Sequence, residues 1–487
     1  MTSLWKIAAL ILVSASTASA QPTQPSPQTF PYRDLTKELA NKVTGTYVVA
    51  ATGDLLIQEP IGKLIDPKIQ QILRDADTTV GNMEALIIDR RNWTNDVGFA
   101  GNWSPKETAA DVAALGFDLL NGANNHTWDM REEGLKSTIK YLDEQGIPLA
   151  GVGPNLATAR MPVFQYTAKG RVGMVGAYAV SDGNVAAATD RRGTMGGGWG
   201  LNPLRLALWN VVTPAQLLQL KGIRDSIVAR RGEPDIVRPI PIPKDDQDRV
   251  RIFANNYMAG PKPGEYHYEM NQSDLRGNLT AIRNAKEYGD FAIFTMHVHQ
   301  NRYAFQLPSN DHYPPNFLIE FTHALIDNGA DMYVGHGNHT IQGVEIYKGR
   351  PIFYNLGNFA VHEILLESDG AAPGVTAVEA DELSTDSLQH PENLVATVAT
   401  SRYQDGKLVE VRLYPIELGV GKSRPWSRMS IAQTPSPALA QEILTNVQKY
   451  SEPFGTKISI ENGVGVIRIA PEATAPVGTN IRTNRSR

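Results

Sequence analysis

Five short polar clusters in this chain carry side chains that can bind metal ions. Each cluster directly follows an apolar run of the kind that forms a β-strand. The clusters are Gly53-Asp54, Asn82-Met83-Glu84, Asn124-Asn125-His126, His297-Val298-His299 and Gly335-His336-Gly337-Asn338-His339. The preceding runs are Tyr47–Ala51, Thr78–Val80, Phe117–Leu120, Phe291–Met296 and Met332–Val334. Because ligands bind beyond the carboxyl ends of the strands in open α/β sheets, we expect these clusters to converge.

The residue types in the clusters favour two-metal hydrolysis. Carboxylate, amide oxygen and imidazole ligands suit Mn, Zn or Fe. A carboxylate between two cations about 3.5–4 Å apart can bridge them, while the pair generates hydroxide and holds the attacking and leaving oxygens. His126 is then free to donate a proton to the leaving group. Asp129 can accept a hydrogen bond from that ring and orient it, although an N-cap for the following helix is an equal alternative.

Each cluster also has a purely structural interpretation. Asp54 after a glycine can be a turn residue, and Glu84 can be a carboxylate at a helix N-terminus. His297 and His299 share one face of an extended segment, so one can be a ligand while the other forms a hydrogen bond or contacts substrate. Asn358 is a weaker candidate for substrate binding on the same rim. Five other histidines are predicted to be surface or structural residues, namely His267, His312, His323, His362 and His390.

Composition limits the function classes. The chain has 487 residues, more than one typical domain, with 42% hydrophobic and 20% charged residues. Its net charge of −5 does not suggest a nucleic-acid binder, which usually has a basic stripe. It has no cysteine, so we expect no disulfides, no lipid attachment through an N-terminal cysteine, and metal ligands restricted to oxygen and imidazole.

The N-terminus is typical of a secretory signal over residues 1–20. Lys6 precedes the apolar run Ile7–Val13, and Ala18-Ser19-Ala20 provides a small-residue cleavage site. A short uncleaved anchor is the alternative, but the run is far shorter than the roughly 20 residues that span a bilayer. We therefore expect an exported protein, periplasmic or extracellular, with a linker over residues 21–43.

From about Thr44, apolar strands alternate with predicted helices, which indicates α/β layering. The helices are predicted at Ser104–Leu115, Arg131–Gln145, Asn278–Tyr288 and Ala438–Tyr450. The predicted main domain covers residues 44–420, with insertions at about 181–275 and 367–392. A small C-terminal α+β segment is expected at 421–470, followed by a disordered tail at 471–487.

Taken in order, the motifs resemble those of a known family. They are Gly53-Asp54, Asn82-x-Glu84, Ala123-Asn124-Asn125-His126, His297, Gly335-His336-x-x-His339 and Leu356-Gly357-Asn358-Phe359. This order and spacing resemble the CapA-type capsule proteins, the poly-γ-glutamate synthesis branch of the calcineurin-like metallophosphoesterase superfamily. The resemblance covers roughly Thr46 to Leu418. It implies a four-layer α/β/β/α sandwich with metals at the strand ends and, here, a small C-terminal α+β appendage.

The resemblance also implies roles for individual residues. Asp54 and His339 would bind the first metal, Glu84 would bridge, and Asn125, His297 and His336 would bind the second metal. His126 would be the acid. The wider superfamily usually has Asp-x-His in its first motif and a bridging Asp, whereas this chain has Asp54-Leu55-Leu56 and Glu84. The site could therefore bind one metal or two. A degenerate fold that keeps only a structural metal is a further alternative.

These observations lead to two hypotheses from different classes. The first is an exported metal-dependent hydrolase that acts on a phosphoester or a γ-glutamyl polymer in capsule metabolism. The second is a non-catalytic assembly or export factor that binds a polyanionic chain together with capsule synthesis machinery. Arg90-Arg91 and Arg191-Arg192 are the candidate cationic contacts for that role.

Overall fold

The computed structural model describes residues 40–93, 101–181, 197–230, 247–252, 255–303, 311–361, 391–419 and 430–469. The predicted signal, the tail, Arg191-Arg192, His362 and His390 lie outside these ranges, as do nearly all of the linker and of the 367–392 insertion. Within them, no helix combines the length and the apolar character needed to cross a membrane.

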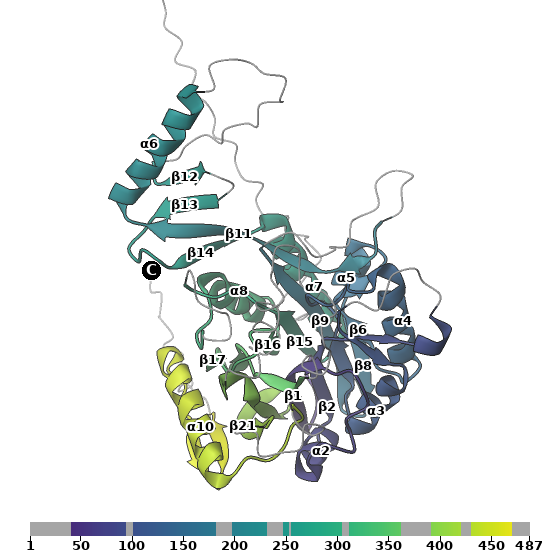
Figure 1. The fold of residues 1–487 in the computed structure, drawn as a ribbon. Helices are drawn as coiled ribbons and strands as arrows, with labels where there is room; N and C mark the ends of the chain where they lie inside the picture. Colours follow the sequence, from purple (N-terminus) through teal and green to yellow (C-terminus); the bar gives the residue numbers. More distant parts are fainter. Residues whose placement is uncertain are drawn as a thin grey trace, which may run out of the picture.

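Two large mixed sheets form the centre of the molecule (Figure 1). The first has the order β22-β23-β21-β20-β1-β2-β5-β6, with β19 also paired to β1. Its strands are β1 (Thr46–Leu56), β2 (Thr78–Met83), β5 (Leu119–Asn121), β6 (Leu149–Ala150), β19 (Asn358–Val361), β20 (Val395–Gln404), β21 (Lys407–Glu417), β22 (Ser459–Glu461) and β23 (Val464–Arg468). All five strands predicted before the polar clusters are present in one or the other sheet.

The second sheet has the order β12-β13-β11-β9-β15-β16-β18-β17, with β14 on β11 and β8 on β9. Its strands are β8 (Val163–Thr167), β9 (Gly170–Val180), β11 (Pro203–Val212), β12 (Arg249–Ile252), β13 (Asn255–Ala259), β14 (Tyr266–Met270), β15 (Phe291–His297), β16 (Met332–His336), β17 (Val344–Tyr347) and β18 (Arg350–Phe353). Two small sheets pair β3 (Leu86–Ile88) with β4 (Trp103–Pro105) and β7 (Val152–Gly153) with β10 (Gly200–Leu201).

Helices pack around the two sheets. They are α2 (Pro67–Arg74), α3 (Glu107–Leu115), α4 (Arg131–Asp143), α5 (Leu156–Arg160), α6 (Pro214–Arg230), α7 (Gln272–Tyr288), α8 (Asn316–Asp327) and α10 (Pro437–Ser451). One apolar cluster packs α2 and α3 on the first sheet, a second fills the space between the sheets, and a third packs α7 and α8 on the second sheet. This order confirms the predicted four-layer α/β/β/α sandwich.

Strand β1 shows why the pattern folds this way. Tyr47, Val49 and Ala51 point into the core between the sheets, whereas Ala50 and Leu55 point toward α2 and α3. Successive side chains of a strand alternate between faces, and both faces of this strand are covered. The sequence of β1 is therefore a nearly continuous apolar run until Asp54.

The C-terminal segment is joined to the first sheet. It contains the predicted helix and strands, but β22 and β23 extend the first sheet beside β21. Ile443, Leu444 and Val447 of α10 belong to the core between the sheets. The segment therefore completes the main sandwich, because β23 pairs with the edge of β21 and the apolar stripe of α10 packs into the core.

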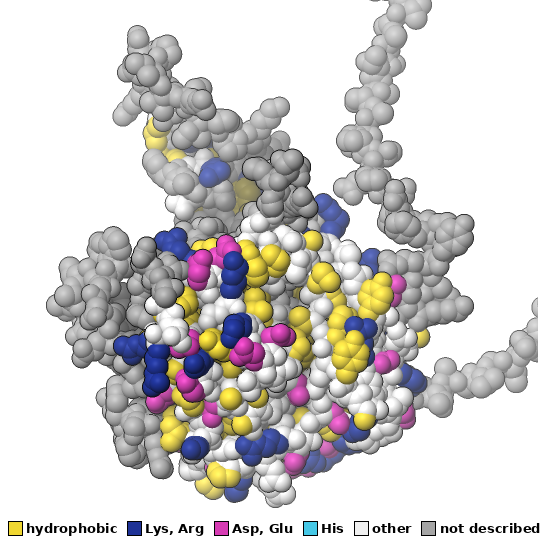
Figure 2. Space-filling model, turned by 90° about the vertical axis from the view of Figure 1, so that its right-hand side faces the viewer, with side chains coloured by type: hydrophobic (Ala, Val, Ile, Leu, Met, Phe, Trp, Pro, Cys, Tyr) yellow, Lys and Arg dark blue, Asp and Glu magenta, His cyan; other side chains and the backbone are white. Residues whose placement is uncertain are grey.

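The expected insertion at 181–275 is also partly integrated. Strand β11 pairs with β9 and so belongs to the second sheet. Only its far end, with β12, β13, β14 and α6, projects from the body as an arm (Figure 1). On the face drawn in Figure 2, basic, acidic and apolar side chains of the described residues are interspersed.

Candidate metal centre

Parallel strand pairing brings the polar clusters together. Asp54 of β1 is in register with Asn82 of β2 on one side and with Asn358 of β19 on the other. In the second sheet, His297 of β15 is in register with His336 of β16. Asp54, Asn82, His297 and His336 lie at or near the carboxyl ends of their strands, and Asn358 begins β19 beside Asp54. The two sheets therefore present these polar residues to one region.

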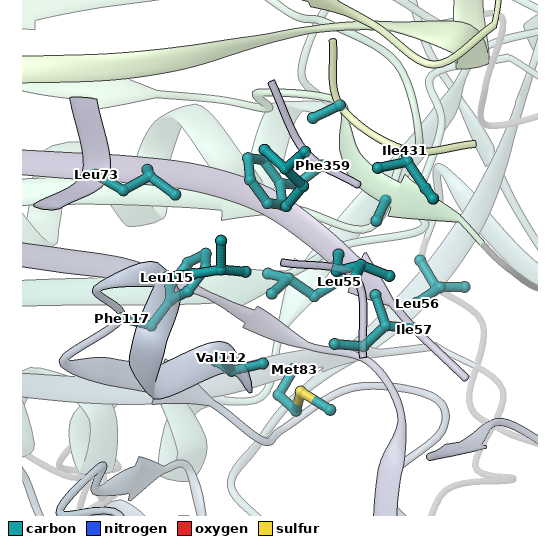
Figure 3. Close-up of a cluster of buried hydrophobic side chains, with 14 of the residues drawn as sticks. Leu55, Leu56, Ile57, Leu73, Met83, Val112, Leu115, Phe117, Phe359 and Ile431 are labelled. Atoms are coloured by element: carbon teal, nitrogen blue, oxygen red, sulfur yellow. The ribbon is translucent and has the colours of Figure 1, made fainter. Parts of the chain in front are cut away.

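The neighbours of the polar residues anchor them in the core. Leu55, Met83 and Phe359 each stand next to a polar residue of the rim and pack in the cluster between the first sheet and α3 (Figure 3). Gly53 allows β1 to approach β19 closely, since a Cβ there would lie 1.6 Å from the carbonyl oxygen of Gly357. The rim is thus held by rigid strands.

Two groups of candidate ligands form in the described part of the chain. Asp54, His297 and His336 make the first, which we call the inner group, and all three are fully buried. Glu84, His299 and His339 make the second, the outer group, in which both histidines are partly exposed. Within each group one ligand atom per residue lies within 4.8 Å of the others.

The two groups are adjacent. His297 Nδ1 lies 3.6 Å from Asp54 Oδ1, and His297 Nε2 lies 3.4 Å from Glu84 Oε1. His336 Nδ1 is also 3.6 Å from Asp54 Oδ1. On the other side, His339 Nδ1 lies 3.7 Å from Asp54 Oδ2. Two histidines, His297 and His339, therefore connect the groups, as expected for two cation positions that share ligands.

The protonation states suit metal binding. Burial alone would raise the pKa of Asp54, but the hydrogen bond from His297 and the nearby charges of His297, His336 and His339 lower it below its ordinary value. Burial lowers the pKa of His336 to about 3. The charge of Asp54 raises this pKa and the neighbouring His297 lowers it further. Burial also lowers the pKa of His297 and of His299. A carboxylate and neutral imidazoles are the ligand forms of these residues.

A network of amides lies beneath the inner group. Asn82 Nδ2 donates to Asp54 Oδ1 over 2.8 Å. Asn82 Oδ1 accepts from Asn121 Nδ2 at 2.8 Å and from Asn124 Nδ2 at 3.2 Å. The Gly337 N–H donates to Asp54 Oδ2 over 2.9 Å. These bonds hold the Asp54 carboxylate in one orientation, and buried polar groups with such partners are stable.

Two further side chains orient imidazoles. Thr295 Oγ1 lies 2.9 Å from His336 Nε2, which leaves Nδ1 of that ring facing Asp54. Asn358 Oδ1 lies 2.9 Å from His339 Nδ1. Asn358 is buried beside His339, so it can support that ring, while its role in substrate binding stays a prediction. The His339 backbone has φ +57, a left-handed conformation that is uncommon outside glycine and often marks functional sites.

Asn125 provides the test of whether these residues fit a metal. Its Oδ1 atom is buried and has no hydrogen-bond partner among the described residues. Its neighbours contact the centre, since Asn124 bonds to Asn82 and His126 Nε2 lies 4.0 Å from Glu84 Oε1. An orphaned amide oxygen costs about 1–3 kcal/mol unless a ligand satisfies it. The oxygen and imidazole donor set therefore fits a hard or borderline divalent cation.

His126 and Asp129 form the predicted pair. His126 Nδ1 lies 2.7 Å from Asp129 Oδ2. Asp129 does not cap α4, whose N-cap residue is Met130 without a side-chain cap bond. The alternative of a helix cap is therefore wrong, while the catalytic role of the pair stays a prediction.

The structure brings together all ten candidate residues, but it groups some differently from the resemblance. His297 and His336 lie with Asp54, and His299 lies with Glu84 and His339. Sequence reasoning missed Asn121, Asn102 and Thr295, which contact the cluster residues; isolated Asn and Thr residues have no distinguishing signal. Two of the other histidines have structural partners, as predicted: His323 bonds to Glu345 and His312 stacks on Tyr450.

Comparison with known proteins establishes the family. The model of the family described as bacterial capsule synthesis protein PGA_cap matches residues 48–363, well over half of the chain. This chain belongs to the PGA_cap family. All ten candidate residues fall inside the matched region, which begins in β1 and ends just after β19.

Individual relatives of this PGA_cap protein differ in how much they share with it. It is 36% identical to the uncharacterized protein y4sH of Sinorhizobium fredii over 464 residues, 90% of this chain and 96% of the relative. It is 22% identical to the PGA biosynthesis protein CapA of Bacillus subtilis, over 63% of this chain and 61% of the relative.

Among solved structures, a Staphylococcus aureus protein provisionally described as a 5'-nucleotidase, in complex with alpha-ketoglutarate, is similar at a TM-score of 0.32 and 10% identity. The similarity spans 83% of this chain and 58% of that one, and a TM-score this low does not establish a common fold.

Proposed function

We propose that this PGA_cap protein is a metal-dependent hydrolase that acts on a phosphoester or a γ-glutamyl amide in capsule or cell-envelope metabolism. The observation that carries the proposal is the adjacency of the inner and outer ligand groups at the carboxyl ends of the strands. Export to the periplasm or the cell exterior, based on residues 1–20, is part of the proposal. The name of the Bacillus subtilis relative motivates poly-γ-glutamate as one test substrate.

The residues that would hold the cations are those of the two groups together with Asn125. A divalent cation there supplies a Lewis acid that polarises the scissile group and makes water acidic enough to attack near neutral pH. The metal would be Mn, Zn or Fe, in one or two positions, because the donors are oxygen and nitrogen.

The chain's own residues handle the proton and the geometry. Asp129 Oδ2 accepts a hydrogen bond from the Nδ1–H of His126 and fixes the ring, so that Nε2 faces Glu84. At Nε2 the ring can pass a proton to the oxygen or nitrogen of the leaving group. Thr295 and Asn358 hold two ligand rings in place, which limits the motion of the reacting groups.

The test combines metal analysis with turnover. Protein purified without chelators is expected to contain one or two equivalents of metal. With Mn or Zn it should hydrolyse a generic phosphodiester or poly-γ-glutamate. His336→Ala should abolish both the bound metal and the hydrolysis. His323→Ala is the matched control, since that histidine contacts Glu345 far from the centre. A wild-type protein that hydrolyses neither substrate, with His336→Ala indistinguishable from it, would disprove the proposal.

A second candidate function is a non-catalytic factor that binds a polyanionic chain. One observation favours it: Arg90 and Arg91 are exposed at the end of β3, where the Arg90 guanidinium lies 5.6 Å from the centre of the Trp103 ring. Trp103 is next to Asn102, which contacts His126. Salt-sensitive binding of poly-γ-glutamate that survives His336→Ala but not Arg90→Ala would support this function over hydrolysis.

A further inference from the structure

Asn102, which no motif singled out, makes two separate contacts with the His126–Asp129 pair. Its side-chain Nδ2 lies 3.1 Å from His126 Nε2. Its backbone N–H donates to Asp129 Oδ2 over 2.8 Å. The residue is 4% exposed, and both contacts are partly buried. A single residue therefore contacts both members of the pair.

The segment that carries Asn102 is tied to the strand that follows Glu84. The carbonyl oxygen of Asn102 accepts from the Leu86 N–H over 2.9 Å, and the next residue, Trp103, pairs with Leu86 between β3 and β4. Glu84 lies only two residues before Leu86. The position of Asn102 is thus set by the same backbone that positions a candidate metal ligand.

Gly101 permits this close approach. Its φ is +76, and a Cβ at this position would lie 2.0 Å from Asp129 Oδ2 and 2.5 Å from Asp129 Cβ. Any side chain here would displace Asp129, and the left-handed backbone would also be strained. The contact between this segment and Asp129 therefore depends on glycine.

The two contacts specify the same tautomer of His126. Asp129 Oδ2 accepts a hydrogen bond from Nδ1–H, while the Asn102 amide donates to Nε2, which must then be unprotonated. Nε2 is also the nitrogen that faces Glu84. We propose that Asn102 is a positioning residue of the centre, which fixes the orientation and tautomer of His126 from both sides.

This inference rests on the proposed function, in which His126 moves a proton at Nε2. In the tautomer described above Nε2 carries no proton, so it first takes one from the attacking water and then passes it to the leaving group. A ring held by Asp129 alone can still rotate out of the plane that faces Glu84, whereas a second contact at Nε2 prevents this. Partners that orient a functional imidazole typically change affinity or activity by about 10–100-fold when removed. We therefore expect Asn102→Ala to lower kcat by about 10–100-fold with KM and metal content little changed.

A spectroscopic measurement tests the inference without any turnover. In protein labelled with ¹⁵N-histidine and kept metal-free, the wild-type signals of His126 should show a protonated Nδ1 and an unprotonated, hydrogen-bonded Nε2. In Asn102→Ala the two signals should move toward the average of both tautomers. Gly101→Ala displaces Asp129 instead, so it should shift the His126 signals by weakening the hydrogen bond at Nδ1. His126→Gln assigns the signals.

The control is Asn328→Ala, which removes a half-buried asparagine that bonds to Arg283 away from the centre. It should leave the His126 signals and kcat unchanged. Because Asn102→Ala and Gly101→Ala act on the same ring, their effects on kcat should be less than additive in the double variant.

Three outcomes would overturn the inference: unchanged His126 signals in Asn102→Ala, an unchanged kcat in an active enzyme, or a loss of metal that alone accounts for the loss of activity. If the wild-type protein shows no hydrolysis, the proposed function fails, and the ¹⁵N signals still decide whether Asn102 sets the tautomer. If the wild-type is active and the signals do not move, only this inference fails.

Discussion

Strands β15 and β16 carry a buried polar cluster at each end, and the two clusters are built differently. At their amino ends, Asp331 bonds to Lys286 Nζ at 2.7 Å and lies 3.2 Å from Arg350 Nε. It also accepts from the Ala292 N–H over 3.0 Å. Asp331 and Lys286 are both almost fully buried. The negative charge is thus matched by two cations of the chain and by the backbone.

At the carboxyl ends the charge is not matched in this way. The contacts of Asp54 are the imidazoles of His297, His336 and His339, the Asn82 amide and the Gly337 N–H. The pKa values of His297 and His336 are lowered by burial, so these rings are neutral. Asn125 also keeps a buried oxygen without a partner among the described residues. A buried polar cluster that satisfies itself is structural, whereas one that leaves negative charge and lone pairs unmatched is suited to a cation.

The largest effect should come from breaking the matched cluster. We expect Asp331→Ala to lower the free energy of unfolding by about 3–5 kcal/mol, because it leaves the buried Lys286 charge uncompensated. Urea unfolding followed by circular dichroism measures this. A loss below about 1 kcal/mol, typical of surface ion pairs, would contradict the contrast between the two ends.

Breaking the unmatched cluster should affect activity more than stability. We expect His336→Ala to reduce kcat/KM by about 100-fold or more, since loss of residues that merely orient ligands already costs about 10–100-fold. In metal-free protein its unfolding free energy should fall much less than that of Asp331→Ala. Metal added to the wild-type should raise Tm, and this gain should vanish in the variant. A Tm gain that persists in His336→Ala would remove this histidine from the ligand set.

A smaller effect is expected where only the orientation of a ligand is changed. In Thr295→Val the valine side chain has nearly the same shape as threonine, but the Oγ1 contact to His336 Nε2 is lost. We expect metal affinity to fall by about 10–100-fold with the fold intact. Isothermal titration with Zn or Mn gives the affinity, and Thr397→Val, a buried threonine of β20, is the control.

The smallest effect concerns Asp118, a carboxyl group at the amino end of β5. Unlike Asp331, it is held by a backbone N–H rather than by Lys and Arg side chains. Burial raises the pKa of Asp118 to about 6, against the hydrogen bond from the Thr79 N–H. The folded state therefore binds more protons than the unfolded state between about pH 4 and 6, and stability falls as pH rises through this window.

Asp118→Asn keeps the acceptor for Thr79 and removes the charge. At pH 7 we expect it to stabilise the protein by about 1 kcal/mol, a value discounted from the full shift because Asp118 is partly exposed. At pH 4 the variant and the wild-type should unfold at the same urea concentration. Equal gains at both pH values would show that burial of this charge is not the cause.

Much of the fold could be predicted from local patterns. The five apolar runs before the polar clusters are strands, and α3, α4, α7 and α10 overlap their predicted ranges. Strands β20 and β21 form an antiparallel hairpin around Asp405-Gly406, a residue pair typical of such turns. The helix and strands of the C-terminal segment were also predicted, but not the core that α10 joins, because an apolar helix stripe shows that a helix is buried but not which core buries it.

The candidate site was predictable only in part. Carboxylates, amides and imidazoles after strands identify themselves by type and position, so Asp54, Glu84 and His336 could be named in advance. Thr295, Asn102 and Asn121 could not, because asparagine and threonine are common in loops and strand ends. Their importance arises from contacts with residues between 24 and 41 positions away.

The sequence by itself determined where strands end and which donor atoms stand there, because alternation of apolar residues and the chemistry of side chains are local properties. Only the tertiary structure decided that His299 lies with Glu84 and His339. It also decided that Asn102 contacts both His126 and Asp129, and that α10 packs in the core of the main sandwich. These relations depend on strand register and on how the two sheets pack, and packing joins residues whose separation along the chain carries no local signal.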